Sequence, residues 1–123
     1  MDKFRFYHFK IYLQSKEFHS DCVKICKKFP AEFFYLANQL KRATLSVILN
    51  IAEGSGKESE KDFRRYLMNA LGSINEAAAC LDVACGEGLI DQKRFQEMME
   101  KCWELKNRIG KLASKIKSKA ISR

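Results

Sequence analysis

The sequence predicts an all-α protein, an antiparallel up-and-down four-helix bundle formed by a single domain of residues 1–123. The chain contains one proline and six glycines, which are too few turn-forming residues for an all-β fold. In four long segments, apolar residues recur at spacings of three and four, as they do in amphipathic helices. The connections between these segments are short, so consecutive helices are expected to be antiparallel neighbours.

The first helix is expected at about residues 10–28, after an aromatic-rich N-terminal arm at residues 1–9 that packs onto the bundle or a neighbouring subunit. Phe29 should end this helix, because the residue before a proline avoids the helical conformation. The apolar residues at helical spacing are Ile11, Phe18, Cys22, Ile25, Cys26 and Phe29.

The second helix is expected at about residues 31–53. Around residues 45–52 it is apolar on almost every side, which predicts burial in a core or against another subunit. Asn50 and Glu53 are one turn apart and should be buried and hydrogen-bonded, so that they tie this helix to the next one. Gly54 and Gly56 are expected to end the helix in the left-handed conformation.

The third and fourth helices are expected at about residues 60–87 and 92–118. Ser59 and Asp91 are the predicted N-caps, and Gly88 or Gly86 should end the third helix. Gly72 lies in the middle of the third helix, where a closely packed neighbouring helix is the expected reason for a glycine. The third helix carries an unbroken heptad seam of Phe63, Leu67, Ala70, Ile74, Ala77, Leu81 and Ala84. The seam of the fourth is Phe95, Met98, Met99, Cys102, Leu105, Ile109, Leu112 and Ile116.

The net charge of +8 comes almost entirely from the end of the chain. Residues 1–100 carry 15 basic and 14 acidic residues, whereas residues 101–123 carry eight basic residues and one acidic residue. A basic segment of this kind predicts an anionic partner, RNA or DNA first. The alternative is an ordinary solvated helix end whose cations complement the helix dipole, but that effect rarely needs so many charges.

The predicted phosphate-binding residues form a stripe on the fourth helix: Lys101, Arg108, Lys115 and Lys119 lie on one flank, with Lys111 nearby. If this stripe is only solvated, the site should instead lie around Lys57, Lys61, Arg64 and Arg65. Aromatic residues suited to base stacking are sparse near the stripe. The sequence therefore predicts contacts with the nucleic-acid backbone and shape, with little sequence readout.

No residue pattern predicts catalysis, a metal or a cofactor. The segment Gly54-Ser55-Gly56-Lys57 lacks the spacing of a phosphate-binding loop and the strand that should precede it. His19 shares a helix face with Cys22 and Cys26, but zinc sites need four ligands, usually from two segments, and the cysteines fit apolar seams. Glu53 has no second carboxylate at helical spacing. We therefore expect a protein that is not an enzyme.

The expected location is the cytoplasm, with no membrane partner. The number of cysteines is odd and most lie in helical patterns, which fits a reduced compartment better than a disulfide scaffold. No apolar run follows the charged N-terminus, and no segment reaches about 18 consecutive apolar residues.

Two segments resemble one protein family: RATLSVILNIAEGSGKES at residues 42–59 and DFRRYLMNALGSINE at residues 62–76. They are similar to the bacterial four-helix-bundle proteins encoded by intervening sequences of 23S rRNA genes, and the likeness covers about residues 9–90. The most specific part is the NIAEGxG motif at residues 50–56. Ile48 and Lys57 depart from the family pattern, which has proline and arginine there, so the second helix should run straighter.

The resemblance implies a homopentamer without established catalytic activity. It also implies kinship with Avd, the accessory protein of diversity-generating retroelements, whose relatives bind RNA and a reverse transcriptase through basic surfaces. The resulting hypothesis is a non-enzymatic, RNA-preferring oligomer that acts as a reverse-transcriptase accessory. The alternative is an interaction scaffold that docks an acidic protein on its basic C-terminal helix.

Overall fold

The computed structural model describes the backbone of residues 4–122 and the side chains of residues 4–117. The predicted all-α four-helix bundle is confirmed, and the described part of the chain contains no strand. The elements are η1 (Arg5–His8), α1 (Lys10–Cys26), η2 (Ala31–Phe33), α2 (Phe34–Ser55), α3 (Glu60–Gly86) and α4 (Gln92–Ser122).

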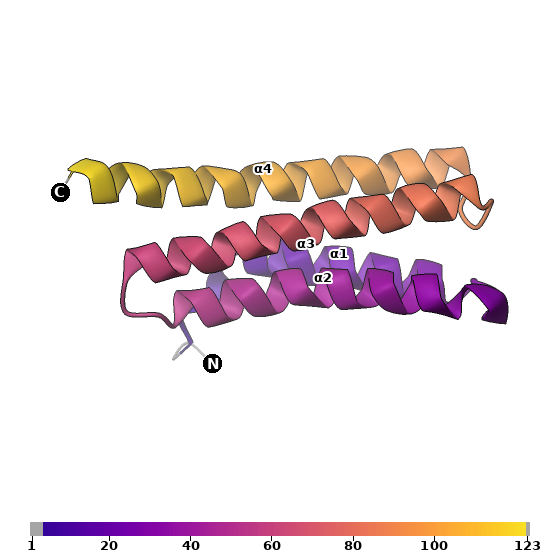
Figure 1. Cartoon of the computed structure of the whole chain (residues 1–123), viewed down its shortest axis with the longest axis horizontal. Helices are drawn as coiled ribbons and strands as arrows, with labels where there is room; N and C mark the ends of the chain where they lie inside the picture. The colour runs from indigo at the N-terminus through magenta and orange to yellow at the C-terminus, as the bar shows by residue number, and fades with distance from the viewer. Residues whose placement is uncertain (1–3, 123) are drawn as a thin grey trace.

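Consecutive helices are antiparallel and lie side by side (Figure 1). The helix α2 packs against both α1 and α3, and α3 packs against α4, whereas α1 and α4 close the bundle through its smallest interface. The helix α4 is longer than expected from the sequence, and its last turns extend past the start of α3 (Figure 1). The α2–α3 turn, the start of α1 and the end of α4 therefore share one end of the bundle.

The core consists of the apolar seams that the sequence predicts. All of the predicted seam residues of α3 and of the first helical segment are buried. In α4, Phe95, Met99 and Leu112 are only partly buried and flank the core, while Ala113 is buried but was not predicted. Ser15 is also buried, and its hydroxyl donates a 2.6 Å hydrogen bond to the Ile11 carbonyl oxygen, which satisfies it within the helix.

The predicted caps of α3 and α4 are confirmed. The Ser59 hydroxyl accepts a 3.1 Å hydrogen bond from the Asp62 N–H, and Asp91 Oδ1 accepts a 2.7 Å bond from the Arg94 N–H. At the end of α3, Gly88 has a φ of 74°, and the Leu89 N–H reaches back to the Ala84 carbonyl oxygen at 2.9 Å. This is the left-handed glycine cap that satisfies the last carbonyls of a helix.

The predicted role of Gly54 is wrong, whereas Gly56 does end α2 as its C-cap, but without the predicted left-handed conformation. Neither glycine has a positive φ; α2 continues through Gly54 to Ser55, and Gly56 follows with a φ of −88°. Gly54 is buried, and a Cβ placed on it would lie 2.6 Å from the Cβ of Tyr66. The prediction for Gly72 is wrong as well, because this residue is exposed and a Cβ there would meet nothing within 4 Å. The close helix approach is therefore at Gly54.

The described part of the N-terminal arm packs onto the bundle, as one of the two predicted arrangements requires. It forms the short 3-10 helix η1 where an irregular segment was expected. Phe9 stacks on Phe63 of α3 with ring centroids 6.3 Å apart, and the Arg5 guanidinium lies 5.1 Å from the centroid of the same ring. Arg5 also donates a 3.3 Å hydrogen bond to the Ser55 carbonyl oxygen at the end of α2. The arm thus covers the core at this end of the bundle.

Candidate nucleic-acid interface

The antiparallel topology places the second half of the predicted stripe and the second predicted group of basic residues at the same end of the bundle. Two contacts fix the register of α3 against α4: Cys102 Sγ lies 3.7 Å from the Ile74 carbonyl oxygen, and Lys106 Nζ donates a 2.9 Å hydrogen bond to Asn75 Oδ1. In this register the first turns of α3 lie beside the last turns of α4. We call this the basic end, defined by Lys57, Lys61, Arg64, Arg65, Lys111, Lys115 and Lys117.

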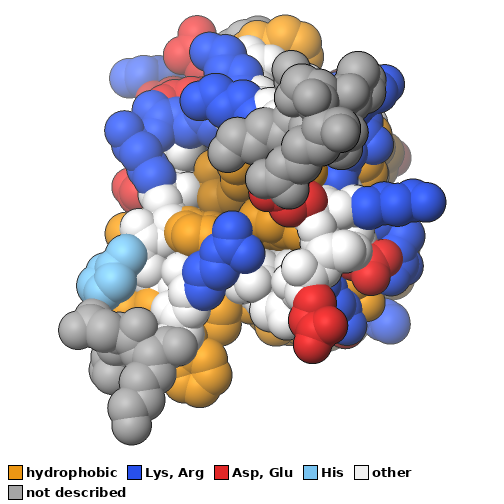
Figure 2. Space-filling view, turned by 90° about the vertical axis from the view of Figure 1, so that its left-hand side faces the viewer, with side chains coloured by type: hydrophobic (Ala, Val, Ile, Leu, Met, Phe, Trp, Pro, Cys, Tyr) orange, Lys and Arg blue, Asp and Glu red, His pale blue; other side chains and the backbone are white. Residues whose placement is uncertain are grey.

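Figure 2 looks onto the basic end and shows Lys and Arg side chains gathered around and across it. The side chains of Lys111, Lys115 and Lys117 are exposed. None of these three takes part in the ion pairs that join side chains within residues 4–117. Lys117 was missed because it lies on the α3 side of α4, away from the predicted stripe. The side chain of Lys119 lies outside the described residues.

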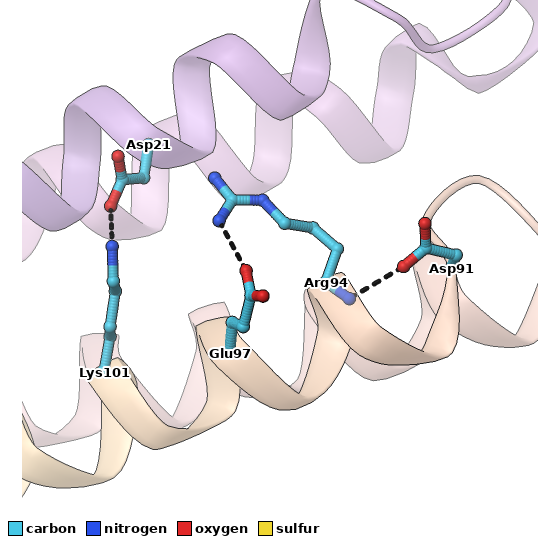
Figure 3. A network of polar contacts seen from close by, with 5 residues as sticks. All are labelled: Asp21, Asp91, Arg94, Glu97 and Lys101. Atoms are coloured by element: carbon cyan, nitrogen blue, oxygen red, sulfur yellow. Dashed lines mark hydrogen bonds and ion pairs between the residues drawn. The ribbon is translucent and has the colours of Figure 1, made fainter.

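The first half of the predicted stripe differs from the second, because its cations have acidic partners. Lys101 Nζ lies 2.7 Å from Asp21 Oδ2 and bridges α4 to α1 (Figure 3). Arg108 Nη2 lies 3.1 Å from Glu104 Oε1, one turn earlier on α4. Both cations also line a groove of about 360 Å³ between α1 and α4. The stripe is therefore not one uniform surface, and its unpaired positive charge begins at Lys111.

The second predicted group lies at the start of α3 and in the turn before it. Lys57 and Arg65 lie over the Tyr66 ring, at 5.2 and 4.8 Å from its centroid. Arg65 is also 3.7 Å from Asp62, but both side chains are more than half exposed, so this pair contributes little. Lys61 is exposed, and Arg64 is half-buried with an Nε that has no hydrogen-bond partner among the described residues. This Nε is itself buried, so a contact of Arg64 with an external anion would have to use the terminal nitrogens of its guanidinium.

The predicted burial of Asn50 and Glu53 is wrong for Glu53 and only partly right for Asn50. Glu53 is exposed because it lies at the edge of α2 beside α3, where its Oε1 accepts a 3.2 Å hydrogen bond from the Tyr66 hydroxyl. Asn50 is half-buried and donates a 2.8 Å hydrogen bond to the Ser46 carbonyl oxygen within α2. The Ser46 hydroxyl in turn lies 2.9 Å from that of Ser73 in α3.

A row of polar contacts therefore runs along the interface between α2 and α3. It joins Gln39 to Glu76, Ser46 to Ser73 and Glu53 to Tyr66, and the close approach at Gly54 lies at its end. Most of these residues belong to the two segments that carry the family resemblance. The motif thus positions two helices, and the positive residues beside it are the candidates for binding.

Four of the five cysteines are buried, as their seam positions predict, and all five are free thiols. Burial raises the pKa of Cys22, Cys26 and Cys80 above the ordinary thiol value, and it raises the pKa of Cys102 to about 11. These thiols are therefore neutral packing groups at neutral pH. Within the described residues, no group of three or more His, Cys, Asp or Glu side chains is arranged to hold a metal ion.

The imidazole of His19 joins α1 to α2, and its burial predicts a pH dependence of stability. Its Nδ1 lies 2.7 Å from Thr44 Oγ1, and burial lowers the His19 pKa below 6.5. The unfolded chain then binds more protons than the folded one between the lowered pKa and pH 6.5. We expect the free energy of unfolding to fall as pH is lowered through this window, and to fall less in His19→Gln. Urea unfolding at several pH values measures this, and equal slopes for both proteins would contradict it.

A family model that describes the 23S rRNA-intervening sequence proteins matches residues 7–111. The chain belongs to this family. The resemblance found in the sequence is thereby confirmed, and the family match extends it to Tyr7 at the N-terminal side and to most of α4. No curated protein matches the chain. None of the described helices is long and apolar enough to cross a bilayer.

This family member also shares its fold with a crystal structure from Bacteroides thetaiotaomicron, a protein with unknown function from the S23 ribosomal protein family. The TM-score is 0.79 and the sequence identity is 22%, over 84% of this chain and 97% of the other. At this identity the similarity supports the four-helix architecture and says nothing of binding.

Proposed function

We propose that this protein is a non-enzymatic bundle that binds RNA through the phosphate backbone at the basic end. The observation that carries the proposal is the meeting of Lys111, Lys115 and Lys117 with Lys61 and Arg64 at one end of a rigid bundle. Lys111 and Lys115 are one helical turn apart, so both can contact a backbone that runs along α4. Positive side chains on a rigid frame are sufficient for such binding.

Two further features support backbone recognition over base readout. Lys111, Lys115 and Lys117 are exposed on α4, so a folded RNA can reach their charged groups. On α4 itself, the exposed aromatic Trp103 lies two turns before Lys111. We therefore expect binding that depends on charge and shape and tolerates changes of sequence.

Reversal of Lys111, Lys115 and Lys117 to glutamate should abolish RNA binding at moderate salt while the helical content stays unchanged. We would measure binding of a structured RNA hairpin by fluorescence anisotropy over a range of salt concentrations. For the unchanged protein, affinity should fall steeply with salt, because each phosphate contact releases counterions. For the triple variant, the slope of log K against log salt should become shallower by about 2–3.

The matched control reverses Lys24, Lys27 and Lys28, which carry the same charge at the opposite end. If this control loses as much affinity as the triple variant, only the net charge matters and the site at the basic end is refuted. Reversal of Lys61 and Arg64 should also weaken binding, because the same surface includes them. An acidic protein retained after nuclease treatment, and released by the triple reversal, would favour the scaffold function over RNA binding.

We further propose that the bundle works as a homo-oligomer, with five copies as the family resemblance implies. Large apolar side chains on the outside of α2 support assembly: Phe34, Tyr35, Leu45 and Leu49 are all exposed. Five copies would also present five basic ends to one nucleic acid. A reverse transcriptase of the retroelement type is the protein partner that the Avd kinship suggests.

A further inference from the structure

At the end of the bundle opposite the basic end, a pocket of about 340 Å³ lies between the end of α1, the α3–α4 connection and the start of α4. Three of its seven lining residues are apolar: Ile25 is buried, and Leu89 and Ile90 are partly buried and pack against the core. Its volume lies at the lower end of the range of about 300–1,000 Å³ typical of ligand sites.

Three cations surround these apolar walls. Lys24, in the last turn of α1, and Lys28, in the turn just after it, are both exposed. Arg94 reaches from α4 toward α1, so its guanidinium lies between the two helices (Figure 3). The acidic residue that lines the pocket is Asp91, and its Oδ1 accepts the Arg94 N–H at 2.7 Å as the cap of α4.

The Arg94 side chain is held in place and still has free donors. Its Nη1 donates a 3.1 Å hydrogen bond to Glu97 Oε2, three residues along the same helix. A guanidinium has five N–H donors, so this bond leaves capacity for a second carboxylate. Arginine presents these donors in a planar fork that matches carboxylate geometry.

We propose that this pocket, which we call the turn pocket, binds a short acidic segment of a partner protein. One apolar side chain of the segment would contact Ile25, Leu89 and Ile90. The carboxylates on either side of it would pair with Lys24, Lys28 and Arg94. The bundle would then have two separate surfaces, with nucleic acid at the basic end and protein at the turn pocket.

The combination of apolar walls and surrounding cations favours a peptide over a nucleic-acid backbone. A sugar–phosphate chain would pair with the cations but offers no aliphatic group for the pocket, whose apolar surface would then stay exposed to water. An acidic segment with one apolar side chain satisfies both features, and desolvation of the apolar contact adds to the charge attraction. The inference does not depend on RNA binding, because the two surfaces share no residue.

The test uses a fluorescein-labelled peptide whose central leucine is flanked on both sides by aspartate and glutamate. We expect saturable binding to the whole protein by fluorescence anisotropy. Lys24→Glu with Lys28→Glu should weaken it about tenfold, the equivalent of about 1.4 kcal/mol. The matched control, Lys16→Glu with Lys27→Glu, makes the same charge change on and just after α1 without touching the pocket, and should change the affinity little.

A second peptide with serine in place of the leucine tests the apolar contact without any change to the protein, and should also bind about tenfold more weakly. Equal binding of the two peptides would overturn the proposal, because the pocket would then contribute nothing. The proposal would also be overturned if the Lys24/Lys28 and Lys16/Lys27 double variants lost equal affinity for the leucine peptide. The absence of saturable binding up to about 1 mM peptide would overturn it as well. Binding of the RNA hairpin should be unchanged by Lys24→Glu with Lys28→Glu, so the two surfaces can fail separately.

Discussion

Gly54→Ala is expected to destabilise the protein by about 1–3 kcal/mol, although alanine is normally the better helix residue. A Cβ at this position would lie 2.6 Å from Tyr66 Cβ and 3.1 Å from Phe63 Cδ1. The Tyr66 Cβ is fixed to the backbone of α3, so the clash cannot be relieved by rotation of a side chain. The two helices would have to separate, which would disturb the polar contacts between α2 and α3.

Gly72→Ala is the matched control, and the expected sign is opposite. Gly72 is exposed in the middle of α3, and a Cβ there would meet nothing within 4 Å. The substitution should stabilise the protein by up to about 1 kcal/mol through helix propensity. Chemical unfolding followed by circular dichroism, at one protein concentration for all variants, measures both changes. A Gly54→Ala protein as stable as Gly72→Ala would refute the close approach of α2 and α3.

The fold was predictable because the local signals in this chain agree with one another. The seam of α3 identifies its buried face without ambiguity, since one heptad pattern covers the whole helix. Ser59, Asp91 and Gly88 have chemical reasons to lie at helix ends, and each is found there. Helix ends differ more from prediction: α1 ends at Cys26, and α2 begins after the short 3-10 helix η2. Whether one more turn at a helix end is α-helical depends on tertiary packing, which the local sequence does not specify.

The roles of the glycines were not predictable from local sequence. Gly54 and Gly56 follow a helix and resemble a C-cap, whereas Gly72 interrupts a helix and resembles a packing site. The structure places the close approach at Gly54 and not at Gly72, because close approach depends on which residues of the neighbouring helix lie opposite. The same limit applies to Glu53: its spacing from Asn50 places both on one side of α2, but whether that side faces the core depends on tertiary packing.

The candidate interface was predictable in composition and not in arrangement. The distribution of charge along the sequence identifies residues 101–123 as the basic segment. Helical spacing places Lys111 and Lys115 on one flank of α4. The sequence treats Lys61 and Arg64 as an alternative site, because they are far away along the chain. Antiparallel packing of α3 against α4 brings Lys61 and Arg64 to the same end of the bundle as Lys111 and Lys115. The pairing of Lys101 with Asp21 depends in the same way on the position of α1.

The helix α2 is apolar on more sides than the bundle core requires. Leu45 and Leu49 are 43% and 54% exposed and lie one turn apart on its outer face. Phe34, nearer the start of the helix, is 56% exposed. Exposed apolar side chains that line up on one helix mark an interaction surface. The sequence predicts that this helix is buried either in a core or against a second subunit. Within one copy of the chain, the core covers only the inner side of α2.

Leu45→Glu with Leu49→Glu is therefore expected to convert an oligomer into monomers without unfolding the bundle. Both side chains point away from the core, and buried glutamates at a subunit interface would lose their hydration without gaining partners. Light scattering at micromolar concentration measures the mass. The control, Gln96→Glu with Ser114→Glu, adds the same charge at exposed positions on α4 and should leave the mass unchanged. A monomeric mass for the unchanged protein would contradict both the surface argument and the pentamer.

The same variant tests whether assembly contributes to RNA binding. In an oligomer, one RNA can contact several basic ends, so that each further contact forms within a complex that already exists. Separation into monomers should then weaken binding of a long RNA by tenfold or more, while binding of a hairpin that spans only one basic end should change little. An equal loss for both RNAs would indicate that the added glutamates act through charge alone. Unchanged binding of the long RNA, together with a monomeric mass, would show that each basic end acts alone.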